Sequence, residues 1–389
     1  MPPSRHRRIN PDRAPRVHVV MVSGCAPPII DGVGDCTAML IEHLAAARPE
    51  WRWTWLARRP RWFHSPVVEG LGYRLVRPVH TWLGATRGLA PFTIRSLRPS
   101  IVHIQEQIHS YFQSDAAILL ARSTRAPVVT TLHEYHVELE SVAHTTSLVR
   151  ISDVVIANDS RNAERSRTEA GREPDALLWS GNTVPPPEPD WGVRRRPGLV
   201  ATFGFVNALK SLGWVFGAIE SLRSSGDESL AWRVVGPFHP ESDAGHAELA
   251  RTMSRPWVEF TGGAHARDRK LRTWLAEAEI MALPYADGAS MRRTTLHAAW
   301  ALGIPVITTP PPHDEPAIVD GRNCLLVRTA DPKAWADAIR AIRCDAGLAE
   351  RLRQGGLETA DRYGWPELAR RHLALYDDLL AARSDGRSS

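Results

Sequence analysis

Short apolar runs alternate with amphipathic stretches through most of the chain, beginning at residue 16. In the first half the apolar runs are RVHVVMVSG (16–24), SIVHIQ (100–105), PVVTTLH (127–133) and DVVIAND (153–159). Runs this short and this apolar are typical of strands that are buried on both faces of a parallel sheet. Helical stretches such as CTAMLIEHLAAA (36–47) lie between them, so the pattern predicts βαβ units.

A proline-rich segment divides this pattern in two. TVPPPEPDWGVRRRPG (183–198) holds five prolines and a charge cluster, so it can form neither a helix nor a central strand. After it the alternation restarts, with strands expected at 199–204, 231–236, 257–262, 280–284, 305–309 and 324–327. Helices are expected near 210–223, 267–277 and 331–343. Two more are expected, one that Ser290 would cap and one that begins at Trp365.

The predicted fold class is therefore α/β, with two successive doubly wound, Rossmann-like domains. The predicted parts are a disordered basic lead-in (1–15), a first domain (16–182), a linker (183–198), a second domain (199–364), and a C-terminal helix with its tail (365–389).

Length and composition agree with this organisation. At 389 residues the chain is about two to three times as long as a usual domain. No stretch approaches the roughly 20 apolar residues that a membrane-spanning helix needs. The basic start lacks the apolar run of a secretory signal, so we expect a cytoplasmic protein without an integral membrane segment.

Cysteine and charge exclude other classes of site. The four cysteines show neither metal nor redox spacing, and we expect free thiols at Cys25, Cys36, Cys324 and Cys344. The net charge of +5 is modest, and the basic residues are dispersed without interleaved aromatics. This pattern disfavours a nucleic-acid partner and leaves the oligomeric state open.

Ligands of doubly wound sheets bind beyond the carboxyl ends of the strands, here expected in a cleft between the two domains. In the first such loop, Gly32 and Gly34 flank Val33, and Asp35 could cap the helix that follows. This arrangement lets a ligand approach the backbone and the helix N-terminus. A tight turn without a ligand is the alternative, and the spacing is not that of a dinucleotide fingerprint.

A second loop, TLHEYH, places His133 where a strand ends. The imidazole there could donate to a sugar hydroxyl, or it could be an ordinary histidine at a strand end. His133 and His136 lack a third ligand at suitable spacing, so a metal site is not expected.

The third loop, GFVNALKSLG, contains Lys210. Only three of the 48 basic residues are lysine, which makes a specific requirement for an ammonium group at residue 210 more plausible than usual. Such a lysine could neutralise a phosphate as a point charge, whereas the alternative is a solvated surface side chain.

The fourth loop precedes the strand at 305–309. Ser290 is expected to cap a helix whose first turn contains Met291, Arg292, Arg293 and Thr294. Cations at that position oppose the helix dipole unless an anion binds over the N-terminus. The loop therefore predicts a diphosphate site, with arginines that extend into solvent as the alternative.

These four loops, in this order, resemble the retaining glycosyltransferases of family 4, which have the GT-B fold. The resembling motifs are DGVGD, TLHEYH, FGFVNALKSLG and ALGIPVITT with EPAIVDGRNCLLV, where Glu315 lies at an expected position. Lys210 corresponds to the family's phosphate-binding lysine, but Phe205 stands at its arginine position. The final helix resembles the one that crosses back to the N-terminal domain.

One departure concerns two glutamates that family members carry eight positions apart. Ser290 and Ala298 stand at these positions here, so the contacts to the donor sugar and ribose lack their usual carboxylates. Branches of the family that carry an Arg-Arg pair in this loop are more similar to this chain. Asp287 is a candidate replacement.

The resemblance implies transfer of a sugar from a nucleotide diphosphate donor, with UDP-sugars expected first, and with retention of configuration. Lys210, Arg292 and Arg293 would stabilise the leaving diphosphate, so no metal or other cofactor is expected. His133, Lys210 and Arg293 are the candidate catalytic residues. A hydroxylated small molecule or glycan would be the acceptor, with candidate contacts at Glu106, Gln107, His109 and Tyr135.

Two other interpretations remain open. A GT-B protein could bind a ligand or partner without turnover, as the missing glutamates would allow. The other interpretation is a nucleotide-sugar enzyme of another type, such as an epimerase or pseudo-glycosyltransferase. The stretch TRGLAPFTIRSLRPS (86–100) is interpreted as a packed helix in preference to a docking surface for a lipid-linked acceptor.

Overall fold

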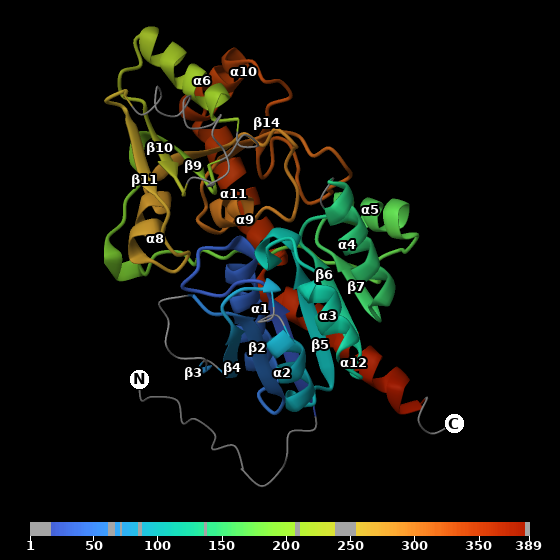
Figure 1. The fold of residues 1–389 in the computed structure, drawn as a ribbon. Helices are drawn as coiled ribbons and strands as arrows, with labels where there is room; N and C mark the ends of the chain where they lie inside the picture. Colours follow the sequence, from blue (N-terminus) through green and yellow to red (C-terminus); the bar gives the residue numbers. More distant parts are fainter. Residues whose placement is uncertain are drawn as a thin grey trace. The chain divides into compact units, whose positions relative to one another are not determined.

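The structure is a computed structural model that describes residues 17–60, 67–70, 72–84, 88–135, 138–206, 211–237 and 254–385 (Figure 1). The chain forms two compact units, each built on one sheet. The first unit holds the residues up to Ala157, Glu164–Ala176, and the chain from Ala369; the second holds Asn158–Ala163 and Leu177–Leu368. Residues 158–163 and 177–182, which the sequence assigned to the first domain, thus group with the second unit.

The first unit contains a sheet of eight strands in the order β3-β4-β2-β1-β5-β6-β7-β8. The strands are β1 (His18–Ser23), β2 (Arg52–Arg58), β3 (Val67–Gly70), β4 (Tyr73–Val79), β5 (Ile101–Glu106), β6 (Val128–Leu132), β7 (Val154–Ala157) and β8 (Ala176–Leu177). The pairs around β1, β5 and β6 are parallel, and β3 joins β4 in the antiparallel sense.

Helices connect the strands of the first unit. They are α1 (Gly32–Ala47), α2 (Leu89–Leu97), the 3-10 turn η2 (Ile108–Tyr111), α3 (Ala116–Arg122), α4 (Leu139–Ile151) and α5 (Ser160–Ala170), whose first turn belongs to the second unit. Every residue of β1 and of β5 is buried, so the prediction of strands covered on both faces is confirmed. Val20, Val102 and Ile104 contribute to the core that α2, α3 and α4 cover on one face.

One local expectation for the first unit was wrong, and another was confirmed. Helix α1 begins at Gly32, and its N-cap is Asp31, whose side chain accepts a hydrogen bond from the Gly34 amide. Asp35, the expected cap, lies inside the first turn. Helix α2 is a packed helix, as expected: it buries Ala90 and Ile94 in the core, while the Phe92 side chain on another face is 73% exposed.

The second unit contains six parallel strands in the order β11-β10-β9-β12-β13-β14. These are β9 (Arg196–Phe203), β10 (Ala231–Val235), β11 (Val258–Gly262), β12 (Ala278–Leu283), β13 (Val306–Thr308) and β14 (Leu325–Leu326). The helices are η3 (Pro189–Trp191), α6 (Leu212–Ser224), α8 (Arg269–Ala276), α9 (Thr294–Ala301), α10 (Pro332–Cys344), α11 (Ala346–Arg362) and α12 (Trp365–Asp385). The predicted α/β class with two parallel-sheet domains is confirmed.

The core of the second unit joins helices α6 and α10 to the sheet. Ile219 on α6 and Trp335 on α10 pack in one cluster with Val200 of β9 and Trp232 of β10. Strand β9 begins at Arg196, inside the predicted linker. Helix α11, which the sequence analysis did not separate from its neighbours, packs against α9.

The last helix belongs to both units. Helix α12 begins at Trp365 as expected, and its residues from Ala369 group with the first unit. There, Tyr376 is fully buried, and its hydroxyl lies 2.5 Å from His103 Nδ1 on β5. Arg48 and Asp377 add an ion pair at 2.8 Å.

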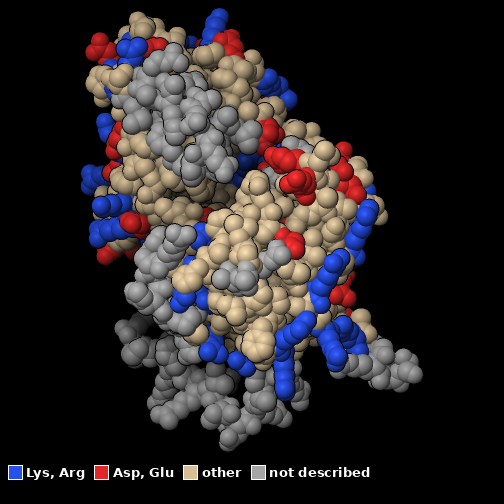
Figure 2. Space-filling model, viewed as in Figure 1, with Lys and Arg blue, Asp and Glu red and all other residues tan. Residues whose placement is uncertain are grey.

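Charge is mixed over the described surface. On the face drawn in Figure 2, basic and acidic side chains occur in both units, with uncharged areas between them. In the described part of the chain, no helix is long and apolar enough to cross a membrane. Cys25, Cys36, Cys324 and Cys344 are free thiols, as expected, and the first three are buried.

We expect Gly236→Ala to lower the free energy of unfolding by about 2–4 kcal/mol. Gly236 follows β10 with φ +146°, and a Cβ there would lie 2.0 Å from the Gly204 carbonyl oxygen, so the backbone itself would have to move. Gly226→Ala is the matched control, because φ is also positive (+111°) but the space is open. Urea unfolding of both variants measures the difference; equal losses would contradict the close approach of the two turns.

Candidate functional site

The strand order locates the switch point of the second sheet. Strand β9 has β10 on one side and β12 on the other. From β9 the chain continues through β10 and β11 on one side, and then through β12, β13 and β14 on the other, so the direction of the strand order reverses between β9 and β12. Ligands of open α/β sheets bind outside the carboxyl ends of the strands at such a point. The loop that follows β12, residues 284–293, begins there and contains the predicted arginines.

The geometry of this loop differs from the prediction. Helix α9 begins at Thr294, with Arg293 at the N-cap position, so Arg292 and Arg293 precede the helix and Ser290 does not cap it. Gly288 has φ +86°, and a Cβ there would lie 2.5 Å from the Pro312 ring. The loop after β12 is therefore folded tightly against the loop after β13.

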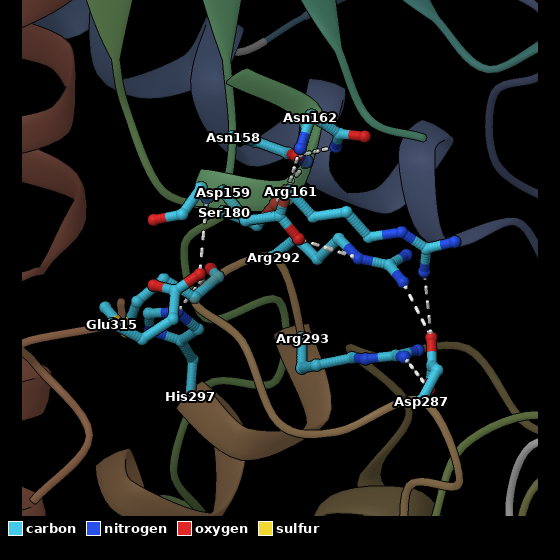
Figure 3. A network of polar contacts seen from close by, with 12 residues as sticks. Asn158, Asp159, Arg161, Asn162, Ser180, Asp287, Arg292, Arg293, His297 and Glu315 are labelled. Carbon is cyan, nitrogen blue, oxygen red and sulfur yellow. Dashed lines mark hydrogen bonds and ion pairs between the residues drawn. The ribbon is translucent and has the colours of Figure 1, made fainter. Parts of the chain in front are cut away.

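Three guanidinium groups meet at one carboxylate in this loop (Figure 3). Arg292 Nη2 donates to Asp287 Oδ2 at 3.0 Å, and Arg293 Nη2 donates to Asp287 Oδ1. Arg161 Nη1 lies 3.5 Å from Asp287 Oδ2. Arg292 and Arg293 are thus ion-paired and do not extend into solvent, as the alternative interpretation of this loop had it.

A second carboxylate comes from the segment 158–163, between β7 and the body of α5. The Asp159 side chain is 1% exposed, and its Oδ2 lies 2.9 Å from Arg292 Nε. The Asn162 amide donates to Asp159 Oδ1 at 2.8 Å, and Asn162 Nδ2 donates to Asn158 Oδ1 at 2.7 Å. A buried carboxylate requires such partners, because an unpaired charge is costly to bury.

A pocket opens beside this network. It is lined by Asp159, Arg161, Asp287, Gly288, Ser290, Arg292, Pro312, His313 and Glu315, all from the second unit. The Ser290 hydroxyl is buried and has no hydrogen-bond partner among the described residues. Glu315 accepts from the Ser160 amide at 3.4 Å, and burial together with the neighbouring Asp159 raises its pKa to about 7.

The pocket combines cationic and protonatable groups. Three guanidiniums exceed the two aspartates by one positive charge, and Glu315 is close to half-protonated at neutral pH because its pKa is about 7. Such a site can bind an anion through the arginines and a hydroxyl group through Ser290 and Glu315.

Sequence reasoning identified part of this group. Ser290, Arg292 and Glu315 line the pocket, and Arg293 joins through Asp287. Met291 is buried, and its carbonyl oxygen accepts from His297 Nε2. Thr294 is the first residue of α9. Asp159 and Arg161 were missed, although the polar residues directly after the strand at 153–159 were a usable signal.

Lys210, a candidate catalytic residue, lies outside the described residues, as does His136. Among the residues that the structure describes, no cluster of three or more His, Cys, Asp or Glu side chains could hold a metal ion.

The other candidates belong to the first unit. Gly32, Val33 and Gly34 form the first turn of α1, and Asp31 Oδ2 accepts from the Ser110 hydroxyl at 2.9 Å. This turn therefore lies beside η2 at the switch point between β1 and β5.

The acceptor candidates occupy different environments. Glu106 ends β5 fully buried, and burial raises its pKa to about 8. Its carboxylate oxygens have no hydrogen-bond partner among the described residues, although Oε1 lies 3.5 Å from His144 Nε2. Gln107 caps η2 by accepting from the Ser110 amide at 2.7 Å. His109 is exposed, whereas Tyr135 is 1% exposed and hydrogen-bonded to Thr146. Of these four side chains, His109 and Gln107 are the accessible ones.

His133 directly follows β6, and buried neighbours orient it. Gln105 Oε1 lies 2.7 Å from His133 Nε2, and Gln105 Nε2 lies 3.1 Å from both Met21 Sδ and His103 Nε2. Because a thioether sulfur only accepts, the amide nitrogen must face it, and the amide oxygen must accept from His133. His133 therefore carries its proton on Nε2.

This chain of hydrogen bonds, here called the relay, continues from His103 to Tyr376 on the C-terminal helix. His103 Nε2 lies 2.8 Å from the Thr131 hydroxyl oxygen and 3.1 Å from Gln105 Nε2, and it accepts from the Gln105 amide. Its Nδ1–H then donates to the Tyr376 hydroxyl oxygen at 2.5 Å. Burial, followed by the neighbouring His372 and His133, holds the pKa of His103 well below its usual value. His103 thus remains neutral and fixes the relay in one pattern.

Comparison with known sequences finds one family that matches part of the chain. The profile of a family described as "Glycosyl transferases group 1" matches residues 197–345, which include β9, the arginine loop and α10. Residues 197–345 thus match the group 1 glycosyltransferases. The resemblance drawn from the four loops is thereby confirmed.

A curated protein is also similar in sequence to this chain. A D-inositol 3-phosphate glycosyltransferase of Nocardioides sp. is 27% identical over 231 residues, which are 57% of this chain and 45% of that protein. The chain thus matches less than half of the length of this relative.

Solved structures share the fold over nearly the whole chain. The sucrose-phosphate synthase of Thermosynechococcus elongatus superposes with a TM-score of 0.77 at 16% identity, covering 94% of this chain and all of that chain. Anabaena HepE in complex with UDP and glucose gives a TM-score of 0.70 at 12% identity, covering 93% of this chain and all of that chain. The GT-B fold expected from the sequence is confirmed.

The structure also shows what surrounds Ser290 and Ala298, the two positions at which the family that this chain resembles carries glutamates. Ser290 lines the pocket, and Ala298 is fully buried on α9. Three other carboxyl groups, those of Asp159, Asp287 and Glu315, line the same pocket as Ser290. The pocket therefore retains acidic groups, supplied from other elements.

We expect Gln105→Leu to release the fixed tautomer of His133, because the variant removes the oxygen that accepts from Nε2. The long-range ¹H–¹⁵N spectrum of the full chain, with His133 assigned by its own substitution, should change from one Nε2–H form to a mixture. Gln354→Leu on the exposed face of α11 is the control. An unchanged His133 tautomer would contradict the relay.

We expect Glu315→Gln to change the pH dependence of stability. The raised pKa of about 7 means that the folded protein holds a proton that the unfolded chain has released above its ordinary pKa of 4.5. The stability from this group is present below that value and is lost as pH rises through about 7.

Because glutamine stays neutral, the Tm of the variant relative to the wild type should rise by a few degrees between about pH 5 and pH 8. Glu358→Gln, at an exposed ion pair with Arg322, is the control and should show no such trend. A flat difference for Glu315→Gln would show that Glu315 is ionised throughout.

Proposed function

We propose that this chain transfers a sugar from a nucleoside diphosphate donor, with a UDP-sugar expected first, to a hydroxylated small molecule or glycan, with retention of configuration. The second unit would bind the donor, and the first unit would bind the acceptor. The observation that carries the proposal is the group of three arginines in the second unit: Arg292 and Arg293 from the loop after β12, and Arg161 from the start of α5.

The arginines suit the leaving group of such a reaction. As the sugar–phosphate bond breaks, negative charge develops on the diphosphate, and fixed guanidiniums stabilise it through bidentate, charge-assisted hydrogen bonds. Arg292 and Arg293 are held by Asp159 and by the Tyr285 ring respectively, so little reorganisation is needed during the reaction. We propose on this basis that the transfer needs no metal ion.

The hydroxyl-binding groups suit the sugar of the donor. Ser290 offers a buried hydroxyl without a partner among the described residues, and Glu315 can donate or accept because its pKa of about 7 allows both states. These two groups would replace the contacts that the family makes through a glutamate at position 290.

The acceptor is proposed from the first unit and the relatives. His133 directly follows β6 and is oriented by Gln105, and we propose that it contacts the acceptor. Gln107 and the exposed His109 follow β5 near the same sheet edge. The names of the Nocardioides relative and of the Thermosynechococcus synthase both contain a sugar or polyol phosphate, which supports a polyhydroxylated small molecule as acceptor.

A GT-B protein that binds its ligand without turnover is the second candidate. It is favoured by Ser290 and Ala298, which remove both family carboxylates, and by Asp287, which already neutralises part of the arginine charge. This candidate predicts donor binding without hydrolysis or transfer.

The first experiment is a thermal-shift panel of UDP, GDP, ADP and dTDP, with and without magnesium. We expect stabilisation by one diphosphate, UDP, in the absence of metal, because ligand binding to the folded state raises Tm. Stabilisation only with magnesium would contradict the metal-independent mechanism. If no diphosphate stabilises the chain, the proposed donor site is wrong. Release of glucose or UDP from UDP-glucose then separates turnover from binding.

We expect Arg293→Gln to weaken UDP binding by about 1–3 kcal/mol, the range for hydrogen bonds to charged groups. The change removes one cation from the network around Asp287 while preserving the length of the side chain. Arg340→Gln, which breaks an exposed ion pair on α10, is the control and should leave the Kd unchanged. Titration calorimetry measures both, and an unchanged Kd for Arg293→Gln would contradict the arginine site.

A further inference from the structure

One carboxylate, that of Asp287, satisfies three guanidiniums in the pocket. Its Oδ2 accepts from Arg292 at 3.0 Å and lies 3.5 Å from Arg161 Nη1, and its Oδ1 accepts from Arg293. An isolated aspartate needs only one such partner. The arrangement is instead that of a small anion bound between several cations (Figure 3).

The arginines have other anchors that place them. Arg292 Nε lies 2.9 Å from Asp159, whose side chain is 1% exposed and whose Oδ1 is tied to the Asn162 amide. The Arg293 guanidinium lies 4.6 Å from the centroid of the Tyr285 ring, which is itself hydrogen-bonded to Thr295. Loss of the contacts to Asp287 would therefore leave both side chains oriented.

Asp287 differs from Asp159 in its surroundings. Its side chain is 17% exposed, and it lies at the pocket wall in the loop between β12 and α9, next to Gly288. Asp159 is enclosed by its own turn through the hydrogen bonds of Asn162. Of the two aspartates, Asp287 is thus the one that a ligand can reach and replace.

We infer that Asp287 is a built-in competitor of the donor diphosphate: it occupies the arginines when the pocket is empty and gives them up when the donor binds. This inference rests on the proposed donor site. A diphosphate carries at least two negative charges and several acceptor oxygens, so it can replace one carboxylate on these arginines. A phosphate or carboxylate ion with a single charge gains nothing over Asp287, so the residue makes the pocket select diphosphates.

Removal of Asp287 should change anion affinity in opposite directions for a competing role and for a structural role. If Asp287 only positioned the arginines, its removal would weaken anion binding. If Asp287 competes with the diphosphate, its removal ends the competition for the arginines. It also removes the repulsion between the Asp287 carboxylate and the bound diphosphate, so binding becomes tighter.

The test uses the full chain and titration calorimetry at low salt, with UDP and inorganic pyrophosphate as probes. We expect Asp287→Asn to lower the Kd of UDP on the order of tenfold, and to lower that of pyrophosphate in the same direction. Asp337→Asn is the matched control, because it removes the same charge from an exposed ion pair on α10, and it should leave both values unchanged. Asp287→Ser is a second neutral variant should Asp287→Asn not fold.

The outcomes separate the inference from the function. Wild-type binding of UDP together with unchanged or weaker binding by both Asp287 variants would overturn the inference and leave the donor site standing. Tighter binding in Asp337→Asn as well would also overturn it, because a general charge effect would then explain the gain. If neither the wild type nor the Asp287 variants bind UDP or pyrophosphate, the donor site and the inference fail together.

Discussion

The ion pair between Arg292 and the buried Asp159 is the interaction on which the candidate site depends. It joins two segments far apart in the sequence, the turn at 158–163 and the loop after β12. A carboxylate that is 1% exposed must keep its cation, since removal of one partner from a buried pair costs about 3–5 kcal/mol. This requirement fixes one guanidinium at the pocket wall, and Arg161 and Arg293 complete the group through Asp287.

The first unit applies the same principle with neutral groups. Gln105, His103 and Tyr376 are buried polar side chains that satisfy one another, and the Met21 sulfur decides which way the Gln105 amide faces. The pattern ends at His133, whose proton position follows from the chain of donors and acceptors. In both units a buried polar residue thus sets the orientation or protonation of a candidate site residue.

Some expectations from the sequence needed correction, and the corrections have one cause. Ser290 was expected as a helix cap because it is a good N-cap residue before a helical stretch, but α9 begins only at Thr294. Two arginines that pair with Asp287 and Asp159 hold residues 290–293 out of the helix. A cap preference of about 1 kcal/mol cannot compete with buried ion pairs, which only the tertiary structure forms.

The sequence by itself determined the α/β class, the strands covered on both faces, the final helix and the family motifs, because these follow from local hydrophobic pattern and spacing. It also indicated Arg292 and Arg293, since they lie in a loop after a strand, and the family resemblance indicated Glu315. Only the tertiary structure decided that Asp159 and Arg161 join them and that Gln105 orients His133. Those contacts connect residues distant in the chain, and burial, which raises the pKa of Glu315 to about 7, exists only once the chain is folded.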